Sequence, residues 1–145
     1  MKRITVLLAD DNRSVRRGFR SLLELAADLE VVGEAKNGRQ AVAMVKKLRP
    51  ALVLMDIAMP LLNGLQATRR ILDAVPATRV LMLSAHSDEV YVEEATSCGA
   101  MGFLVKVTCA AIICLAIREL QKGNMFFSPS IPKHLHKVSR KKEEG

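Results

Sequence analysis

Short apolar segments alternate with amphipathic segments along most of this chain, and this alternation limits the possible folds more than any other feature. The apolar segments are nearly continuous in aliphatic residues, a pattern typical of strands that are buried on both faces. We therefore predict a strand at each of them. They are Ile4–Ala9, Val31–Glu34, Leu52–Met55, Val80–Leu83 and Phe103–Val105.

The segments between these strands have apolar residues at helical spacing, and several begin or end at Asn, Gly, Ser or Pro. Strands that alternate with helices predict a parallel sheet covered by helices on both faces and joined by right-handed crossovers. A chain of 145 residues suits a single domain of this kind. The predicted helices cover 13–28, 38–48, 64–74, 87–97 and 109–122.

Composition excludes several classes of protein. No apolar run approaches the roughly 20 residues of a membrane-spanning helix, and two acids follow "MKRITVLLA" too early for a signal peptide, so we expect a cytoplasmic protein. Cys98, Cys109 and Cys114 lack the paired spacing of a zinc site and are interpreted as buried free thiols. Aromatic residues make up 3% of the chain, which argues against a surface that stacks nucleic-acid bases.

Charge is unevenly distributed. The net charge is +7, and the last thirteen residues carry +3 of it. A basic tail can contact nucleic acid or a membrane, but we interpret this one as a solvated linker. It contains no helix-turn-helix pattern, so we expect neither specific DNA binding nor membrane binding by this chain.

Polar side chains stand at the ends of four predicted strands. Asp10 and Asp11 follow the first strand, and Asp56, Ser84 and Lys106 follow the third, fourth and fifth. In parallel sheets, ligands bind at the carboxyl ends of the strands. Three carboxylates at one edge would repel each other unless a hard cation lay among them, and oxygen ligands of this kind suit Mg²⁺.

A phosphoryl group explains the remaining residues. Ser84 offers a hydrogen-bond donor and Lys106 a positive charge for phosphoryl oxygens. Asp56 is then the nucleophile that forms an aspartyl phosphate. Each residue alone has a simpler interpretation, such as a helix cap, a turn or a surface lysine. Their joint placement at strand ends favours the phosphoryl site.

Four motifs resemble, in order and spacing, the receiver domain of two-component response regulators: "LLADDN", "LVLMDIAMPLLNG", "VLMLSAH" and "GAMGFLVK". "RRGFRSLLE", "VVGEAKNGRQAV", "LAIREL" and "GNMFFSPSI" resemble its NarL/FixJ (LuxR-type) branch. The resemblance implies a flavodoxin-like α/β fold, with a doubly wound five-stranded parallel sheet in the order 2-1-3-4-5 and five helices. It also implies phosphorylation of Asp56 by a sensor histidine kinase with Mg²⁺.

The resemblance also implies a role for each site residue. Asp11, Asp56 and the backbone carbonyl of Ala58 would bind the metal directly, and Asp10 would bind it through water. Lys106 would contact the phosphoryl group. Ser84 and Phe103 match the hydroxyl and aromatic residues that respond to phosphorylation, although ordinary core packing is the competing interpretation of Phe103.

The domain limits follow from the same resemblance. Residues 1–125 would form the receiver domain and 126–145 a linker with a basic tail, because the C-terminal DNA-binding domain usual in this branch is absent from the sequence. We favour a regulator that controls transcription through such a domain. The alternatives are a stand-alone receiver that relays phosphate or docks a partner, and an aspartate-dependent phosphohydrolase. The second is disfavoured because Ala58 stands where that class needs another acid, so we expect no enzyme.

The fifth predicted helix is apolar on more than one side. Ala111, Ile112 and Leu115 fall away from the side predicted to face the sheet, where an amphipathic helix should be polar. A few exposed apolar residues are also tolerated on protein surfaces, but the resemblance implies dimerisation through the first and fifth helices. We therefore predict a homodimer interface here, with arginines of the first helix nearby: Arg13, Arg16, Arg17 and Arg20.

Overall fold

The computed structural model describes residues 2–85, 89–106 and 110–136. Within them lies a parallel sheet in the order β2-β1-β3-β4-β5-β6. The predicted order of the first five strands is confirmed, but the predicted total of five is wrong because β6 adds a sixth strand. With two residues, β6 is too short to show a periodic pattern. The strands are β1 Ile4–Ala9, β2 Leu29–Ala35, β3 Leu52–Asp56, β4 Arg79–Ser84, β5 Gly102–Val105 and β6 Phe126–Phe127.

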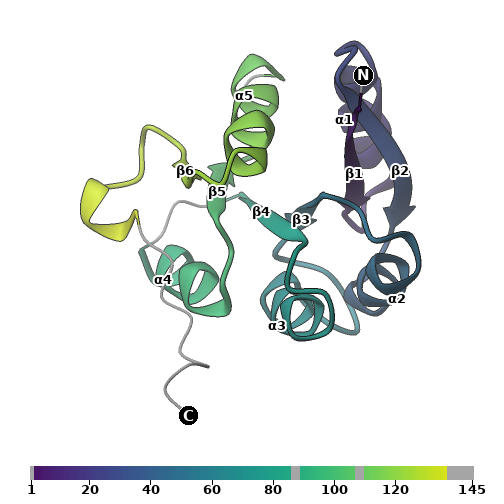
Figure 1. Ribbon diagram of the computed structural model, residues 1–145. Helices are drawn as coiled ribbons and strands as arrows, with labels where there is room; N and C mark the ends of the chain where they lie inside the picture. Colours follow the sequence, from purple (N-terminus) through teal and green to yellow (C-terminus); the bar gives the residue numbers. More distant parts are fainter. Residues whose placement is uncertain (1, 86–88, 107–109, 137–145) are drawn as a thin grey trace.

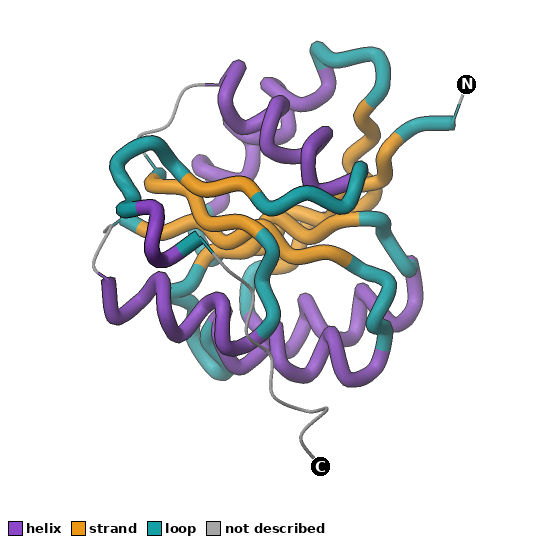
Figure 2. Tube along the Cα trace, turned by 60° about the vertical axis from the view of Figure 1, so that its left-hand side comes forward, coloured by secondary structure: helices purple, strands orange, loops and turns teal. Residues whose placement is uncertain are grey.

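Helices cover both faces of the sheet, as predicted. Figures 1 and 2 show α1 and α5 on one face and α2, α3 and α4 on the other. Helix α1 ends earlier than predicted, because the backbone N–H groups of Leu25 and Ala26 turn back to Leu22 and Leu23 before β2 begins. The helices are α1 Arg13–Glu24, α2 Gly38–Leu48, α3 Gly64–Ala74, α4 Glu89–Cys98 and α5 Ala110–Gln121, with a short 3₁₀ helix, η1, at Lys133–Leu135.

Side chains that alternate along the strands form two hydrophobic layers. Leu7, Met55 and Phe103 lie in the layer between the sheet and α2, α3 and α4. Leu8 and Leu104 lie in the layer against α1 and α5. The strands are buried on both faces because each layer takes alternate residues, which is why their sequences are almost continuously apolar.

Two of the three cysteines lie in described helices, Cys98 in α4 and Cys114 in α5. Cys98 is buried and Cys114 is half-buried, and neither is part of a disulfide bond. Cys109 lies outside the described residues. No helix in the described part of the chain is both long enough and apolar enough to cross a membrane.

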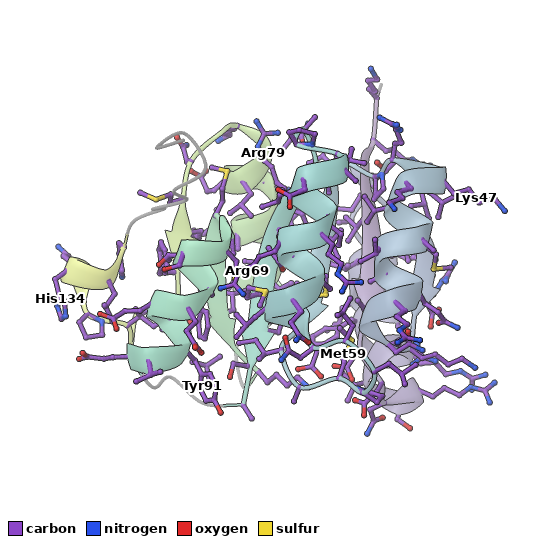
Figure 3. All side chains as sticks on the ribbon, turned by 90° about the horizontal axis from the view of Figure 1, so that it is seen from below. Lys47, Met59, Arg69, Arg79, Tyr91 and His134 are labelled. Atoms are coloured by element: carbon purple, nitrogen blue, oxygen red, sulfur yellow. The ribbon has the colours of Figure 1, made fainter. Side chains whose placement is uncertain are left out.

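The packed structure continues past residue 125, where the sequence analysis places the start of a linker. Strand β6 pairs with β5, and Phe127, Ile131 and Leu135 are buried in the layer beside α4. Figure 3 shows η1, which carries His134, next to α4, which carries Tyr91. The sequence pattern did not reveal this segment because Pro129 and Pro132 interrupt it, so its buried residues belong to no long helix or strand.

Helix α5 exposes fewer apolar side chains than predicted. Ala111 and Leu115 are exposed, with Leu115 at 44% exposure, but Ile112 is half-buried and packs against the core layer beneath α1 and α5. The helix packs beside α1, so two helices supply the core contacts there. A helical wheel drawn for α5 alone places Ile112 outside because it contains no tertiary contacts.

Candidate functional site

Four strand ends place the predicted polar residues at one edge of the sheet. Asp56 and Ser84 are the last residues of β3 and β4, Asp10 follows β1, and Lys106 follows β5. The backbone N–H of Lys106 donates to the Ser84 carbonyl at 2.7 Å, and this bond holds the end of β5 against β4. The parallel arrangement therefore brings residues from distant parts of the chain together.

Lys106 joins the two buried carboxylates. Its Nζ lies 3.0 Å from Asp10 Oδ2 and 3.3 Å from Asp56 Oδ1. The Asp10 and Asp56 side chains are 4% and 5% exposed, so these contacts form largely away from water. One ammonium thus balances two buried negative charges in part, and a net negative charge remains.

Asp11 completes an acidic cluster. One carboxylate oxygen from each of Asp10, Asp11 and Asp56 lies within 4.8 Å of the others. Asp10 Oδ1 accepts a hydrogen bond from the Asn12 N–H at 2.9 Å, but buried Oδ2 has no hydrogen-bond partner among the described residues beyond its ion pair with Lys106. A buried carboxylate oxygen with spare lone pairs, beside two further carboxylates, suits a small hard cation.

Burial makes Asp56 a weaker acid than an ordinary aspartate. Desolvation, followed by the negative charge of Asp10, raises its pKa to about 6, while Lys106 and a backbone hydrogen bond from Ala58 lower it in part. The pKa of Lys106 is lowered by burial but raised more by Asp10 and Asp56, so its net shift is upward. A charged Lys106 favours the ionised form of Asp56, which is the form that can act as a nucleophile.

A cleft opens next to Asp56. It has a volume of about 140 Å³ and is lined by Asp56, Ala58, Ser84, Tyr91 and Lys106, with Ile57 and Ala85. The predicted hydroxyl and ammonium groups therefore face the same space as the predicted nucleophile. Tyr91 was missed by the sequence analysis, because its position on α4 gives no sign that it lies near a strand end.

Comparison with known proteins identifies the family. Residues 6–118 match the model of the response regulator receiver domain. This chain belongs to that family. The match covers most of the chain, including each strand end that carries a polar residue of the site.

Relatives of this receiver domain include named transcriptional regulators. It is 38% identical over 128 residues to the transcriptional regulatory protein LnrK of Bacillus subtilis, covering 88% of this chain and 58% of that protein. It is 34% identical over 139 residues to DegU of Brevibacillus brevis, covering 96% and 59%. The chain thus spans about three fifths of the length of these relatives.

Solved structures agree with this assignment. A two-component response regulator of the LuxR family from Aurantimonas superimposes with a TM-score of 0.87 at 30% identity, covering 92% of this chain and 96% of that one. The signal receiver domain of the response regulator NarL from Mycobacterium tuberculosis gives 0.83 at 33% identity, covering 86% and 100%. The flavodoxin-like prediction and the LuxR-type assignment are both confirmed.

Two glycines that the sequence analysis did not single out hold the loop after Asp56 in this receiver domain. A Cβ on Gly64 would overlap the backbone oxygen of Asp56, and a Cβ on Gly38 would overlap that of Leu62. The loop itself turns at Leu61, whose φ is 67°, and closes through a 2.8 Å bond from the Gly64 N–H to the Ile57 carbonyl. The available signal was the pair of Asn-Gly dipeptides, since each Asn caps the following helix.

Arginines of α1 hold the loop that carries the acidic pair. Arg16 Nη1 donates to the Asp10 carbonyl at 2.7 Å, and its Nε lies 3.0 Å from Glu34. Arg20 also contacts Glu34, at 2.7 Å, and lowers the pKa of that carboxyl. Arg13 and Arg17 are exposed, so half of the arginines predicted to lie near a dimer interface are instead engaged within the domain.

Phe103 lies near the site but does not line the cleft. Its side chain is fully buried in the core layer beside α4, and it pairs with Met82 in the sheet. In this arrangement Phe103 contributes to ordinary core packing.

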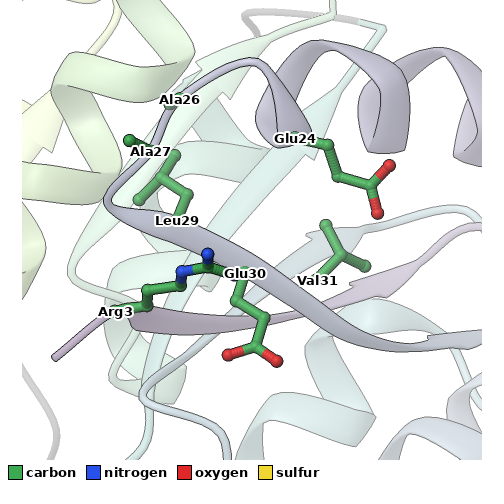
Figure 4. Close-up of a pocket in the computed structure, with 7 residues that line it drawn as sticks. All are labelled: Arg3, Glu24, Ala26, Ala27, Leu29, Glu30 and Val31. Carbon is green, nitrogen blue, oxygen red and sulfur yellow. The ribbon is translucent and has the colours of Figure 1, made fainter.

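A second hollow lies away from these strand ends. Figure 4 shows it near the start of β2 and the end of α1, with Arg3, Glu24 and Glu30 among the lining side chains. Its volume is about 360 Å³, larger than that of the cleft beside Asp56. None of the predicted site residues lines it, so size alone does not identify the site.

Proposed function

We propose that this receiver domain accepts a phosphoryl group on Asp56 from the phosphohistidine of a sensor kinase. The observation that carries this proposal is the position of Asp56, buried at a strand end within an acidic cluster and 3.3 Å from Lys106 Nζ. The cleft beside it gives a phosphoryl group access to Asp56 and Ser84 together. A buried aspartate without these neighbours would lack both the positive charge of Lys106 and the cleft through which a phosphoryl group can reach it.

The transfer is a displacement at phosphorus. A carboxylate oxygen of Asp56 forms the new O–P bond while the P–N bond to the kinase histidine breaks, and the electron pair of that bond stays on the histidine nitrogen. Lys106 can pass from its contact with the Asp56 carboxylate to the new phosphoryl oxygens. The Ser84 hydroxyl can donate to another of these oxygens, which allows the phosphoryl group, with its charge of about −1.5 to −2, to influence β4 and β5.

Mg²⁺ fits the acidic cluster in this proposal. Asp10, Asp11, Asp56 and the Ala58 carbonyl would hold it, and the bound ion would neutralise charge on the carboxylates and on the transferring group. Buried Asp10 Oδ2, whose partner among the described residues is the Lys106 ammonium alone, has lone pairs to spare and supports this assignment. Ser84 and Phe103 would form the responding pair, with Phe103 moving into the space released as Ser84 turns toward the phosphoryl group.

The proposal for the whole protein is wider. The named relatives are transcriptional regulators that extend beyond the length matched here. We infer that phosphorylation of this domain controls a helix-turn-helix DNA-binding domain and thereby transcription. Both the kinase's phosphohistidine and the DNA are found in the cytoplasm, so the protein would act there.

Labelling with a small phosphodonor tests the central step. Acetyl phosphate with Mg²⁺ should add one phosphoryl group, seen by intact mass, and Asp56→Asn should abolish it. The exposed Asp73 on α3 provides a matched control, since Asp73→Asn should label normally. Labelling that persists in Asp56→Asn, or that is unchanged by excess chelator, contradicts the proposed nucleophile or the proposed metal.

Helices α1 and α5 are the proposed interface of a phosphorylation-dependent dimer. They lie side by side, and a hollow of about 360 Å³ is lined by Val15, Gly18, Phe19, Leu22, Lys106 and Ile113. Leu115 and Ala111 are the exposed apolar side chains of the described part of α5. Leu115→Lys should reduce dimerisation in sedimentation of the phosphorylated domain, while Val90→Lys on α4 should not. A wild type that stays monomeric when phosphorylated rules this interface out.

A further inference from the structure

Ser128, just after β6, makes two hydrogen bonds to β5. Its backbone N–H donates to the Phe103 carbonyl at 2.9 Å, and its Oγ accepts from the Val105 N–H at 2.9 Å. The residue is 3% exposed, so these bonds are shielded from water. Val105 directly precedes Lys106, and Ser128 therefore holds the strand next to the lysine of the phosphoacceptor site.

The other side of the same strand end is held by Ser84. The Lys106 N–H donates to the Ser84 carbonyl at 2.7 Å. The carboxyl end of β5 is thus fixed between a residue that lines the cleft and a residue of the C-terminal segment. A shift of this strand end must either carry Ser128 with it or break a buried hydrogen bond.

Ser128 also bonds to the rest of the segment, which is itself packed. The Ile131 N–H donates to the Ser128 carbonyl at 2.9 Å, and Ile131 and Leu135 are 2% and 1% exposed. The rings of Phe127 and His136 stack with their centroids 4.5 Å apart. Residues 126–136 therefore form a packed strap along β5 and α4, and the Ser128 side chain bonds this strap to β5, the strand that Lys106 follows.

We propose that Ser128 is a positioning residue that couples Lys106 to the strap, so that changes at the phosphoacceptor site alter the stability of residues 126–136. This inference rests on the proposed function, because phosphorylation is the change that would turn Lys106 and Ser84 toward the phosphoryl group. Coupling of this kind is reciprocal, so loosening the strap must also disturb Lys106. The strap lies between the receiver core and the residues that follow 136, where a signal to a further domain would have to pass.

Hydrogen exchange of the strap, measured by mass spectrometry, tests the coupling. In the wild type, phosphorylation with acetyl phosphate and Mg²⁺ should change exchange in peptides covering 126–136, and Ser128→Ala should abolish that change. Ser128→Ala should also raise basal exchange by about fivefold, since one buried hydrogen bond is lost. Ser128→Thr, which keeps the hydroxyl, should restore the response, and exposed Ser130→Ala is the matched control that should behave as wild type.

A second measurement does not depend on phosphorylation. Lys106→Met and Ser128→Ala, combined in a double-mutant cycle, should affect strap exchange non-additively if the two residues are coupled. Additive effects, or a phosphorylation response that survives in Ser128→Ala, overturn the inference. If the wild type gains no phosphoryl mass, the proposed function fails instead, and the double-mutant cycle still decides whether Ser128 and Lys106 are coupled.

Discussion

Gly64→Ala should damage both the stability of the domain and its phosphorylation. Gly64 is the first residue of α3, and a Cβ there would overlap the Asp56 backbone oxygen and lie 2.9 Å from Ile57 Cα. These neighbours are backbone atoms and cannot rotate away as a side chain would. The overlap must therefore push the Asp56 backbone or the start of α3 out of place.

The contacts allow an estimate of the size of this effect. Overpacking costs about 1 to 3 kcal/mol, and a clash with backbone belongs at the upper end of that range. Replacing a helical glycine returns about 0.5 to 1 kcal/mol. We expect a net loss of about 2 kcal/mol in the free energy of unfolding, or a fall of roughly 6 °C in Tm. Displacement of the nucleophile should slow labelling of Asp56 by about tenfold or more.

Gly18→Ala is the matched control for this experiment. Gly18 lies within α1 and is exposed, and a Cβ there would meet no atom within 4 Å. The same substitution should therefore stabilise the domain by about 0.8 kcal/mol and leave labelling unchanged. Urea unfolding and intact-mass labelling measure both effects. If Gly64→Ala proves as stable as Gly18→Ala, or labels at the wild-type rate, the close approach at Asp56 does not constrain the site.

Three further results are expected. In metal-free buffer, Asp56→Asn should raise the free energy of unfolding at pH 7.5 by up to about 3 kcal/mol. The pKa of Asp56 in the folded wild type is about 6 and exceeds the ordinary 3.8, so the wild type loses stability as the pH rises through this interval. Urea unfolding should show the gain vanish near pH 4, and a gain independent of pH would contradict the raised pKa. Mg²⁺ at about 100 times its Kd should stabilise the wild type by about 2.7 kcal/mol in a thermal shift assay, and equal stabilisation of Asp10→Asn would argue against that ligand. Arg118→Ala should raise the lowered pKa of Asp28 toward its ordinary value in a carboxyl NMR titration, because the guanidinium contacts both Asp28 oxygens at 2.8 and 3.0 Å.

Much of the fold and the candidate site was predictable from local sequence. A strand buried on both faces must be apolar at nearly every position, so β1, β3 and β4 stand out without any tertiary information. The polar residues at the ends of β1, β3, β4 and β5 were equally visible. Parallel strands share one carboxyl edge, and this rule alone was enough to group Asp10, Asp56, Ser84 and Lys106.

Other features are decided only when distant segments meet. Arg16 contacts Glu34, and Ser128 contacts Val105, through side chains whose local sequence shows no sign of a partner. The raised pKa of Asp56 likewise depends on burial and on the distance to Asp10, which no periodicity contains. Sequence patterns encode which face of an element is buried, because that depends on neighbours a few residues away. Ion pairs, close backbone approaches and the short strand β6 depend instead on distances between segments that only the tertiary structure brings together.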